Sequence, residues 1–174
     1  DATKATVSAA GVVTGGNAGS VTITATYSQK SISVTLNVKK VLQSIALSGG
    51  TSVAAGSTLQ LVTTATYLGA ANEIVTTSTT YSSDSSKATV GASSGLVSGV
   101  AEGSATITAT HQGKTTTVAI TVTKAVNSLT MTTAGNATEF DSGATLQLTT
   151  TANNVGGSTD NVTTSAVYTT SDAT

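Results

Sequence analysis

The chain has 174 residues with no cysteine, proline or tryptophan, and its net charge is −1. Charged residues make up 9% of it, far below the usual quarter or so, and the missing cysteines exclude disulfides and thiol catalysis. Seven lysines spread along the chain, with no arginine beside them, form no basic patch, so nucleic acid is not an expected partner.

The composition favours β-structure. Threonine occurs 39 times, and β-branched side chains pack well on a pleated sheet. Disordered chains combine low hydrophobicity with a large net charge, whereas this chain has almost no net charge and shows regular alternation of Val, Ile and Leu. We therefore expect an all-β fold whose weakly charged surface tolerates self-association.

The first 40 residues contain patterns that return later in the chain. Residues 4–7 (KATV), 11–15 (GVVTG) and 18–26 recur at an offset of 83 to 84, as residues 87–90, 95–99 and 102–110. A second set, residues 58–61 (TLQL) and 76–81, recurs at an offset of 87, as residues 145–148 and 163–168. Such a period is the signature of tandem modules.

These offsets divide the chain into three parts. Residues 1–40 read as the C-terminal half of a module, residues 41–124 as a complete module, and residues 125–174 as the N-terminal half of another. Residues 1–3 are identical to residues 172–174, which suggests either a longer array with a repeat of about 171 residues or chains that complete one another's split module. A chance match of three residues is the remaining alternative.

Alternation within residues 41–124 predicts six or seven short strands, as in a β-sandwich. The expected strands are residues 44–47, 59–67, 79–83, 88–90, 104–111 and 115–123. The expected core, drawn from the apolar parity of strands in both 1–40 and 41–124, consists of Val21, Ile23, Val34, Leu36, Leu59, Leu61, Ile107, Val118, Ile120 and Val122. Residues 38–42 and 122–126 join successive modules without a Gly, Ser or Pro spacer, so we expect short, stiff joints.

Residues 81–84, 87–90, 95–110 and 117–123 resemble the group 2 bacterial immunoglobulin-like domain. The family pattern is a Ser-Ser-Asp turn, an Ala-Thr-Val strand, a Gly-x-Val-Thr-Gly segment and a Thr-rich hairpin, and residues 95–99 read Gly-Leu-Val-Ser-Gly at the third of these. With both halves counted, the resemblance covers essentially the whole chain, although the proline common near the module start is missing. It implies tandem immunoglobulin-like β-sandwich modules, as found in surface layers, adhesin stalks, cell-wall proteins and phage virions.

No catalytic, cofactor-binding or metal-binding residue is predicted, and no cofactor or enzyme activity is expected. His111 has no second histidine near it and is expected to be a solvent-exposed turn residue, and the carboxylates of Asp84 and Asp172 are expected to cap backbone amides. Only Glu139 and Asp141 lie close together in sequence, which leaves a calcium site between modules open. Asn136 and Asn161 begin Asn-x-Thr sequences, which we treat as coincidental in so Thr-rich a chain.

The expected function is that of a structural module in a self-assembling extracellular surface layer or filament of a bacterium. The alternatives are a passive adhesin stalk, a phage virion decoration and a carbohydrate-binding module. The expected partner is the chain itself, head to tail and side by side, with cell wall or host surface contacted through domains outside this chain. No membrane span is predicted, because no stretch approaches 20 apolar residues.

Overall fold

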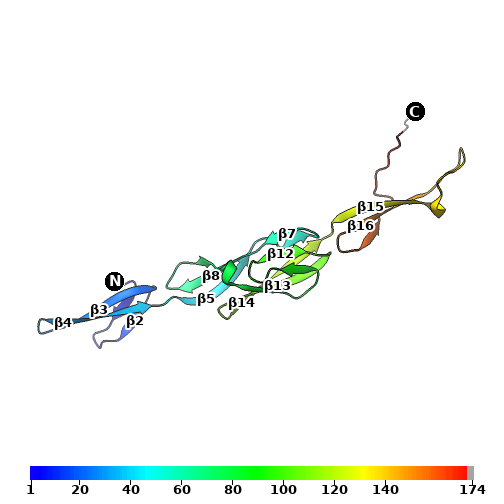
Figure 1. Ribbon diagram of the computed structural model, residues 1–174. Coiled ribbons are helices and arrows are strands. Elements are labelled where there is room, and N and C mark those ends of the chain that lie inside the picture. Colours follow the sequence, from blue (N-terminus) through cyan, green and yellow to red (C-terminus); the bar gives the residue numbers. More distant parts are fainter. Residues whose placement is uncertain (172–174) are drawn as a thin grey trace.

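The computed structural model describes residues 1–171 as an elongated, nearly all-β molecule (Figure 1). Three groups of strands follow one another along its length, and the two ends of the chain lie at opposite ends of the molecule. Residues 1–40 form one end, residues 41–124 form the middle, and residues from 125 onward form the other end. The expected all-β class is confirmed.

The N-terminal part contains two separate antiparallel pairs. Strand β1 (Ala5–Val7) pairs with β2 (Val13–Gly15), and β3 (Gly19–Tyr27) pairs with β4 (Lys30–Val38). The C-terminal part is a three-stranded sheet in the order β15 (Val126–Thr133), β16 (Leu148–Asn154) and β17 (Thr159–Asn161), with a 3-10 turn at Ala134–Asn136.

The central module, residues 41–124, is built from three sheets. The largest has the order β10 (Thr80–Ser83), β13 (Gly103–His111), β14 (Lys114–Thr123) and β6 (Ser52–Ala54), with β6 parallel to β14. A second contains β11 (Ala88–Val90), β12 (Leu96–Gly99) and β7 (Thr58–Gln60). The third contains β5 (Val41–Ser48), β8 (Val62–Leu68) and β9 (Glu73–Ile74), and a 3-10 turn follows at Thr76–Ser78.

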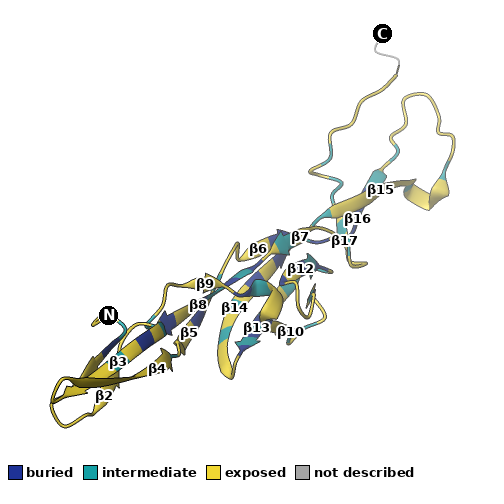
Figure 2. Cartoon of the chain, turned by 60° about the vertical axis from the view of Figure 1, so that its left-hand side comes forward, coloured by how far each residue is buried: buried dark blue, intermediate teal, exposed yellow. Residues whose placement is uncertain are grey.

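The inner face of the hairpin β13–β14 forms the centre of the core. Every second residue of β13 is buried, from Ala105 through Ile107 and Ala109, and Ile120 and Val122 of β14 face the same side. Val97 of β12 in the second sheet and Leu61, which lies between β7 and β8, close this core from the other side, as an immunoglobulin-like sandwich requires. Figure 2 shows that buried residues gather in the middle of the molecule, while both ends are largely exposed.

The expected strands of the central module are present, but the structure divides one of them and adds three short strands, including the two-residue β9. The expected single strand 59–67 is divided at Leu61, because β7 pairs with β12 whereas β8 pairs with β5, so the chain changes sheets at this residue. Strands β6 and β12 were not predicted, since each is only three or four residues long and shows no clear alternation.

The predicted core is confirmed in the central module and is partly wrong in residues 1–40. Leu61, Ile107, Ile120 and Val122 are buried, and Leu59 and Val118 pack against the same core. Val21 is also buried and Ile23 is half-buried. Val34 and Leu36, however, remain 53% and 37% exposed, because within residues 1–171 the short pair β1–β2 leaves these side chains of β4 uncovered.

Ile120 provides a test of the core. Replacing its fully buried side chain by alanine removes three methyl or methylene groups and leaves a cavity, so Ile120→Ala should lower the free energy of unfolding of the central module by about 2 to 5 kcal/mol. Chemical denaturation measures this loss. The exposed neighbour Thr121, changed to alanine, is the matched control and should shift the midpoint little; equal shifts for the two variants would contradict the assigned strand register.

Candidate functional site

Within residues 1–171, no three His, Asp or Glu side chains lie close enough together to hold a metal ion. The acidic pair Glu139 and Asp141 is exposed in the loop before β16. No helix in the same range is long and apolar enough to cross a membrane. The ion pairs and polar networks of the chain are instead concentrated where successive parts meet, and these joints are the candidate functional sites.

The prediction that His111 is a solvent-exposed turn residue is wrong. The side chain is 5% exposed, and its Nδ1 atom lies 2.9 Å from the carbonyl oxygen of Ser78, a residue of the 3-10 turn. The reason is the parity of β13, because His111 follows Ala105, Ile107 and Ala109 on the inward side of the strand. It serves to close one end of the core.

Asp84 has the capping role that the sequence predicts. Its carboxylate accepts a hydrogen bond of 2.7 Å from the backbone N–H of Thr106, and this bond holds the pKa of Asp84 below its ordinary value. Asp172, for which the same role is expected, lies outside the described residues.

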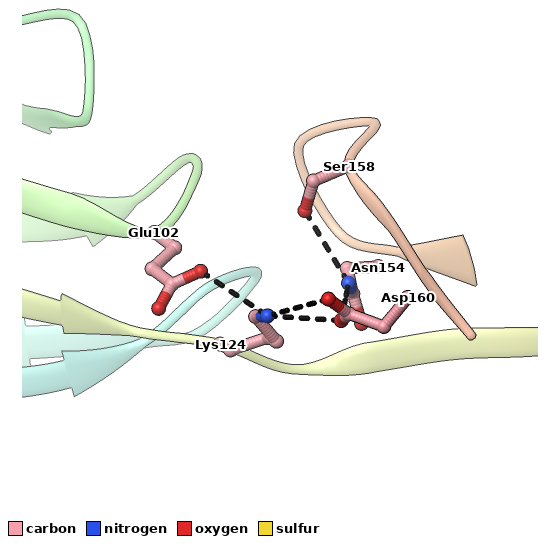
Figure 3. A network of polar contacts seen from close by, with 5 residues as sticks. All are labelled: Glu102, Lys124, Asn154, Ser158 and Asp160. Atoms are coloured by element: carbon pink, nitrogen blue, oxygen red, sulfur yellow. Dashed lines mark hydrogen bonds and ion pairs between the residues drawn. The ribbon is translucent and has the colours of Figure 1, made fainter. Parts of the chain in front are cut away.

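The joint between the central module and the C-terminal part is organised by Lys124, which stands just after β14 (Figure 3). Its ammonium group bridges the two parts, because it lies 2.9 Å from a carboxylate oxygen of Asp160 on β17 and 3.5 Å from a carboxylate oxygen of Glu102 in the central module. The side-chain amide of Asn154 donates a hydrogen bond of 2.7 Å to Asp160 and fixes this carboxylate from its far side.

Close packing adds to the ion pairs at this joint. Ala125 and Val155 pack against the core of the central module, and the backbone N–H of Val155 donates to the carbonyl of Ala125 at 2.9 Å. Gly156 approaches Ala101 so closely that a Cβ atom at position 156 would overlap the Cβ atom of Ala101. The two parts therefore share apolar surface as well as charge.

The same joint is built at the other end of the central module. Lys40 is the counterpart of Lys124 in the repeat and forms an ion pair with Glu73, the counterpart of Asp160. Gly69, the counterpart of Gly156, accepts a hydrogen bond of 2.6 Å from the N–H of Ala18 in the N-terminal part. Both joints therefore contain one lysine and one acidic residue, which lies on the third strand of the sheet that follows the lysine. Each joint also contains one glycine where the two parts of the chain touch.

The joints differ in what supports the lysine. Lys40 lies over the ring of Tyr67, 4.2 Å from its centre, and Asn154 occupies the equivalent position at the other joint. The first joint thus adds a cation–π contact, while the second adds the amide of Asn154 and the carboxylate of Glu102.

The charges at the second joint stabilise one another. The hydrogen bond from Lys124, together with that from Asn154, holds the pKa of Asp160 below its ordinary value. The hydrogen bond to Asp160 raises the pKa of Lys124 above its ordinary value. Both groups are therefore charged over a wide range around neutral pH.

The domain family of group 2 bacterial immunoglobulin-like domains matches residues 41–122. The central module belongs to this family. The match agrees with the resemblance seen in the sequence and with the sandwich of β13–β14 against β12 and β7.

Several known proteins are similar to the chain. Ice-binding protein 1 of Shewanella frigidimarina is 35% identical over 170 residues, which is 97% of this chain but only 19% of that protein. Domains 4 and 5 of the surface-layer protein SbsC are 30% identical, with 68% of this chain and 64% of that chain covered and a TM-score of 0.43. Domains 1–6 of SbsC are 24% identical over 90% of this chain and 29% of that chain, with a TM-score of 0.45. The chain thus spans about a fifth of the length of its curated relative.

Sequence reasoning recognised that the joints are short but missed the residues that fix them. Lys124 and Asp160 are 36 residues apart, and Lys40 and Glu73 are 33 apart, so no local pattern links the partners. The available signal was the repeat itself, because a lysine recurs 84 residues after Lys40 and an acid recurs 87 residues after Glu73.

Gly156 tests the packing at the joint between the central module and the C-terminal part. Gly156→Ala should shift the distance between spin labels placed in the central module and on β16, since the new methyl group overlaps Ala101. Gly157→Ala is the matched control, because Gly157 has nearly the same backbone conformation, with φ 88 against 91, and open space around it. If the inter-label distance shifts equally in both variants, backbone strain at a positive φ causes the shift, and the overlap with Ala101 does not.

The ion pair predicts how the joint responds to pH. Because the pKa of Asp160 is lowered on folding, its contribution is complete above the unfolded value of about 4 and is lost as the pH falls through its folded value. The contribution of the raised Lys124 is lost only as the pH rises through its folded pKa, above about 10.4. The distribution of inter-label distances should therefore broaden in acid and stay narrow from about pH 5 to 9. Asp160→Asn should remove most of this acid dependence. If the distribution of this variant broadens in acid as much as that of the unmodified chain, a group other than Asp160 causes the broadening.

Proposed function

We propose that this chain is a structural segment of a longer extracellular bacterial protein, in which immunoglobulin-like modules in series act as a semi-rigid rod. The observation that carries the proposal is the repeated joint. A lysine, an acid and a closely packed glycine occur at both ends of the central module, so each module is held to the next by the same contacts.

The joints limit bending because they combine three different constraints. Two residues connect β4 to β5, and two connect β14 to β15, so there is no slack in the backbone. Apolar contacts at Ala125 and Val155 and the close approach of Gly156 resist both separation and rotation. The ion pairs are exposed and individually weak, and they act mainly by selecting one orientation.

The outer face of the hairpin β3–β4 also favours a structural role. The outer face of β3–β4 is a ladder of hydroxyl groups that hydrogen-bond in pairs, such as Thr24 with Ser33 at 2.8 Å and Thr26 with Ser31 at 2.8 Å. Such a face is polar, uncharged and internally satisfied. We therefore infer a structural role without catalysis, on the outside of the cell.

The length of the curated relative supports a segment of a larger protein. The match to Ice-binding protein 1 spans 19% of that protein, so its name describes a far longer molecule and assigns ice binding to no particular stretch. We propose that the present chain acts as a spacer in a longer protein whose other domains make the specific contacts.

A self-assembling surface layer is the second candidate. It is favoured by the net charge of −1 and by the small share of charged residues, because little electrostatic repulsion opposes side-by-side contact of the neutral faces. In the single chain, the contacts between parts follow the chain order, which favours the rod.

Distance measurements test the rod. Spin labels in the N-terminal part and on β16 should give one narrow distance distribution at neutral pH. Insertion of a four-residue Gly-Ser spacer after Lys124 should broaden the distribution, because it removes the backbone constraint while leaving the modules intact. A broad distribution in the unmodified chain would refute the rod. Ordered two-dimensional arrays of chains would favour the surface layer instead.

A further inference from the structure

The tip of the hairpin β13–β14 in the complete central module carries His111, the one histidine of the chain. Among the Asp, Glu, Lys and His side chains of residues 1–171, it is the only buried one, with 5% of its surface exposed. Histidine side chains ordinarily change charge between pH 5 and 8. A group that titrates in this range therefore lies inside a module whose other buried side chains do not.

The contacts of His111 fit the neutral ring. A carbonyl oxygen only accepts hydrogen bonds, so the 2.9 Å contact between Nδ1 and the carbonyl oxygen of Ser78 assigns the proton to Nδ1. Nε2 is then the unprotonated nitrogen; it is buried, and no polar atom within residues 1–171 forms a hydrogen bond with it. A second proton would place an N–H donor and a positive charge at Nε2, and burying either without a partner is costly.

The ionisable groups around His111 do not offset this cost. Lys114 lies directly opposite it on β14 and has the same sign as a protonated ring. Tyr81 of β10 and Tyr67 of β8 supply hydroxyl groups and no carboxylate. The carboxylate of Glu73 on β9 is engaged in the ion pair of the first joint. Within residues 1–171, none of the ion pairs includes the imidazole.

The hydrogen bond from His111 is one of three that hold the 3-10 turn at Thr76–Ser78 to the core. The hydroxyl of Tyr81 donates to the first carbonyl of the turn at 3.3 Å, and the hydroxyl of Thr79 donates to the carbonyl just before the turn at 2.8 Å. Only the imidazole changes its charge near neutral pH. A protonated ring is solvated only outside the module, so it must swing out, and its bond to the turn then breaks.

We propose that His111 is an acid-sensitive latch, which fastens the tip of the hairpin β13–β14 to the 3-10 turn while the ring is neutral and releases the turn in mild acid. The turn follows β9, and β9 carries Glu73 of the joint to the N-terminal part. Release therefore loosens the central module next to the strand that holds this joint. The inference goes beyond the rod, because the rod is a property of the chain at neutral pH and needs no histidine.

The closed latch excludes a proton that the unfolded chain binds. In unfolded chains an imidazole is protonated below about pH 6.5, and carboxylates are protonated only near pH 4. Stability rises with pH wherever the unfolded state binds more protons. The stability of the central module should therefore be complete above about pH 6.5 and fall as the pH falls from there, well before the acid response of Asp160 begins.

Chemical denaturation of the whole chain at pH 7.5 and at pH 5 tests the latch. The folded-to-unfolded ratio of the central module should fall by up to about thirtyfold over this interval, because one excluded proton changes the ratio by up to tenfold for each pH unit below about 6.5. His111→Asn is the matched variant, since its side-chain N–H can replace Nδ1 as the donor to Ser78 and cannot titrate. Its ratio should change less than about threefold.

A charge placed opposite the ring gives a second test that leaves His111 itself unchanged. Lys114→Glu puts a carboxylate directly across the hairpin, where it stabilises the protonated ring, so the acid loss should shrink at least threefold relative to Lys114→Gln. His111→Gln replaces the asparagine variant if that variant does not fold. An acid loss that is absent in the unmodified chain, or that is equal in the unmodified chain and the His111 variant, would overturn the proposal.

Hydrogen exchange shows whether the release is local. The backbone N–H groups of Ser78 and Thr79 close the turn, so their protection, corrected for the intrinsic exchange rate, should fall at least tenfold between pH 7.5 and pH 5. The amides of β13 in the middle of the sheet should lose less, and His111→Asn should abolish the difference. Loss of protection that is equal over the whole module would overturn the local latch. None of these results would affect the rod, which is tested at neutral pH.

Discussion

The inner face of the hairpin β13–β14 must be covered, and the central module is arranged around this need. Ile107, Ile120 and Val122 on that face are almost completely shielded from water. The polar Thr residues alternate with them and point outward, so a shift of one residue in register would place the apolar set in solvent. The strands β6, β7, β10 and β12 are short, and their positions follow from pairing with this hairpin or closing the core above it.

The same constraint explains why the repeat can be divided and still be recognised. Pairing within each half is local in sequence, so β3–β4 and β15–β16 form without the other half. Burial is not local, because it needs both sheets. The hairpin β3–β4 therefore has the strand pairing of β13–β14 without its core, which is why the apolar parity of Val34 and Leu36 predicts the strand correctly and the burial wrongly.

Alternation and repeat offsets were sufficient to predict the fold class and the main hairpins. They were insufficient where a residue's environment depends on a distant partner. His111 appeared to be a turn residue because the hairpin loop follows it, yet it lies inside the module because its strand parity continues to the last residue. The joints were missed for a related reason, since Lys124 meets Asp160 only after the intervening sheet has folded.

The offsets themselves show which contacts the repeat preserves. The offset is 84 residues for the counterparts Ile45 and Leu129, as it is for Lys40 and Lys124, and 87 for Glu73 and Asp160, so the C-terminal part has three extra residues between β15 and β16. That insertion lies in the loop around residues 134–147, and Figure 1 places this loop far from the joint at Lys124. The acid and the glycine of the joint lie beyond the insertion, on β17 and in the turn before it, and they keep their places because β16 retains its register on β15. The length of the loop therefore differs between the repeats at the end of the sheet far from the joint. The register of β16 on β15 keeps the joint residues in the same positions.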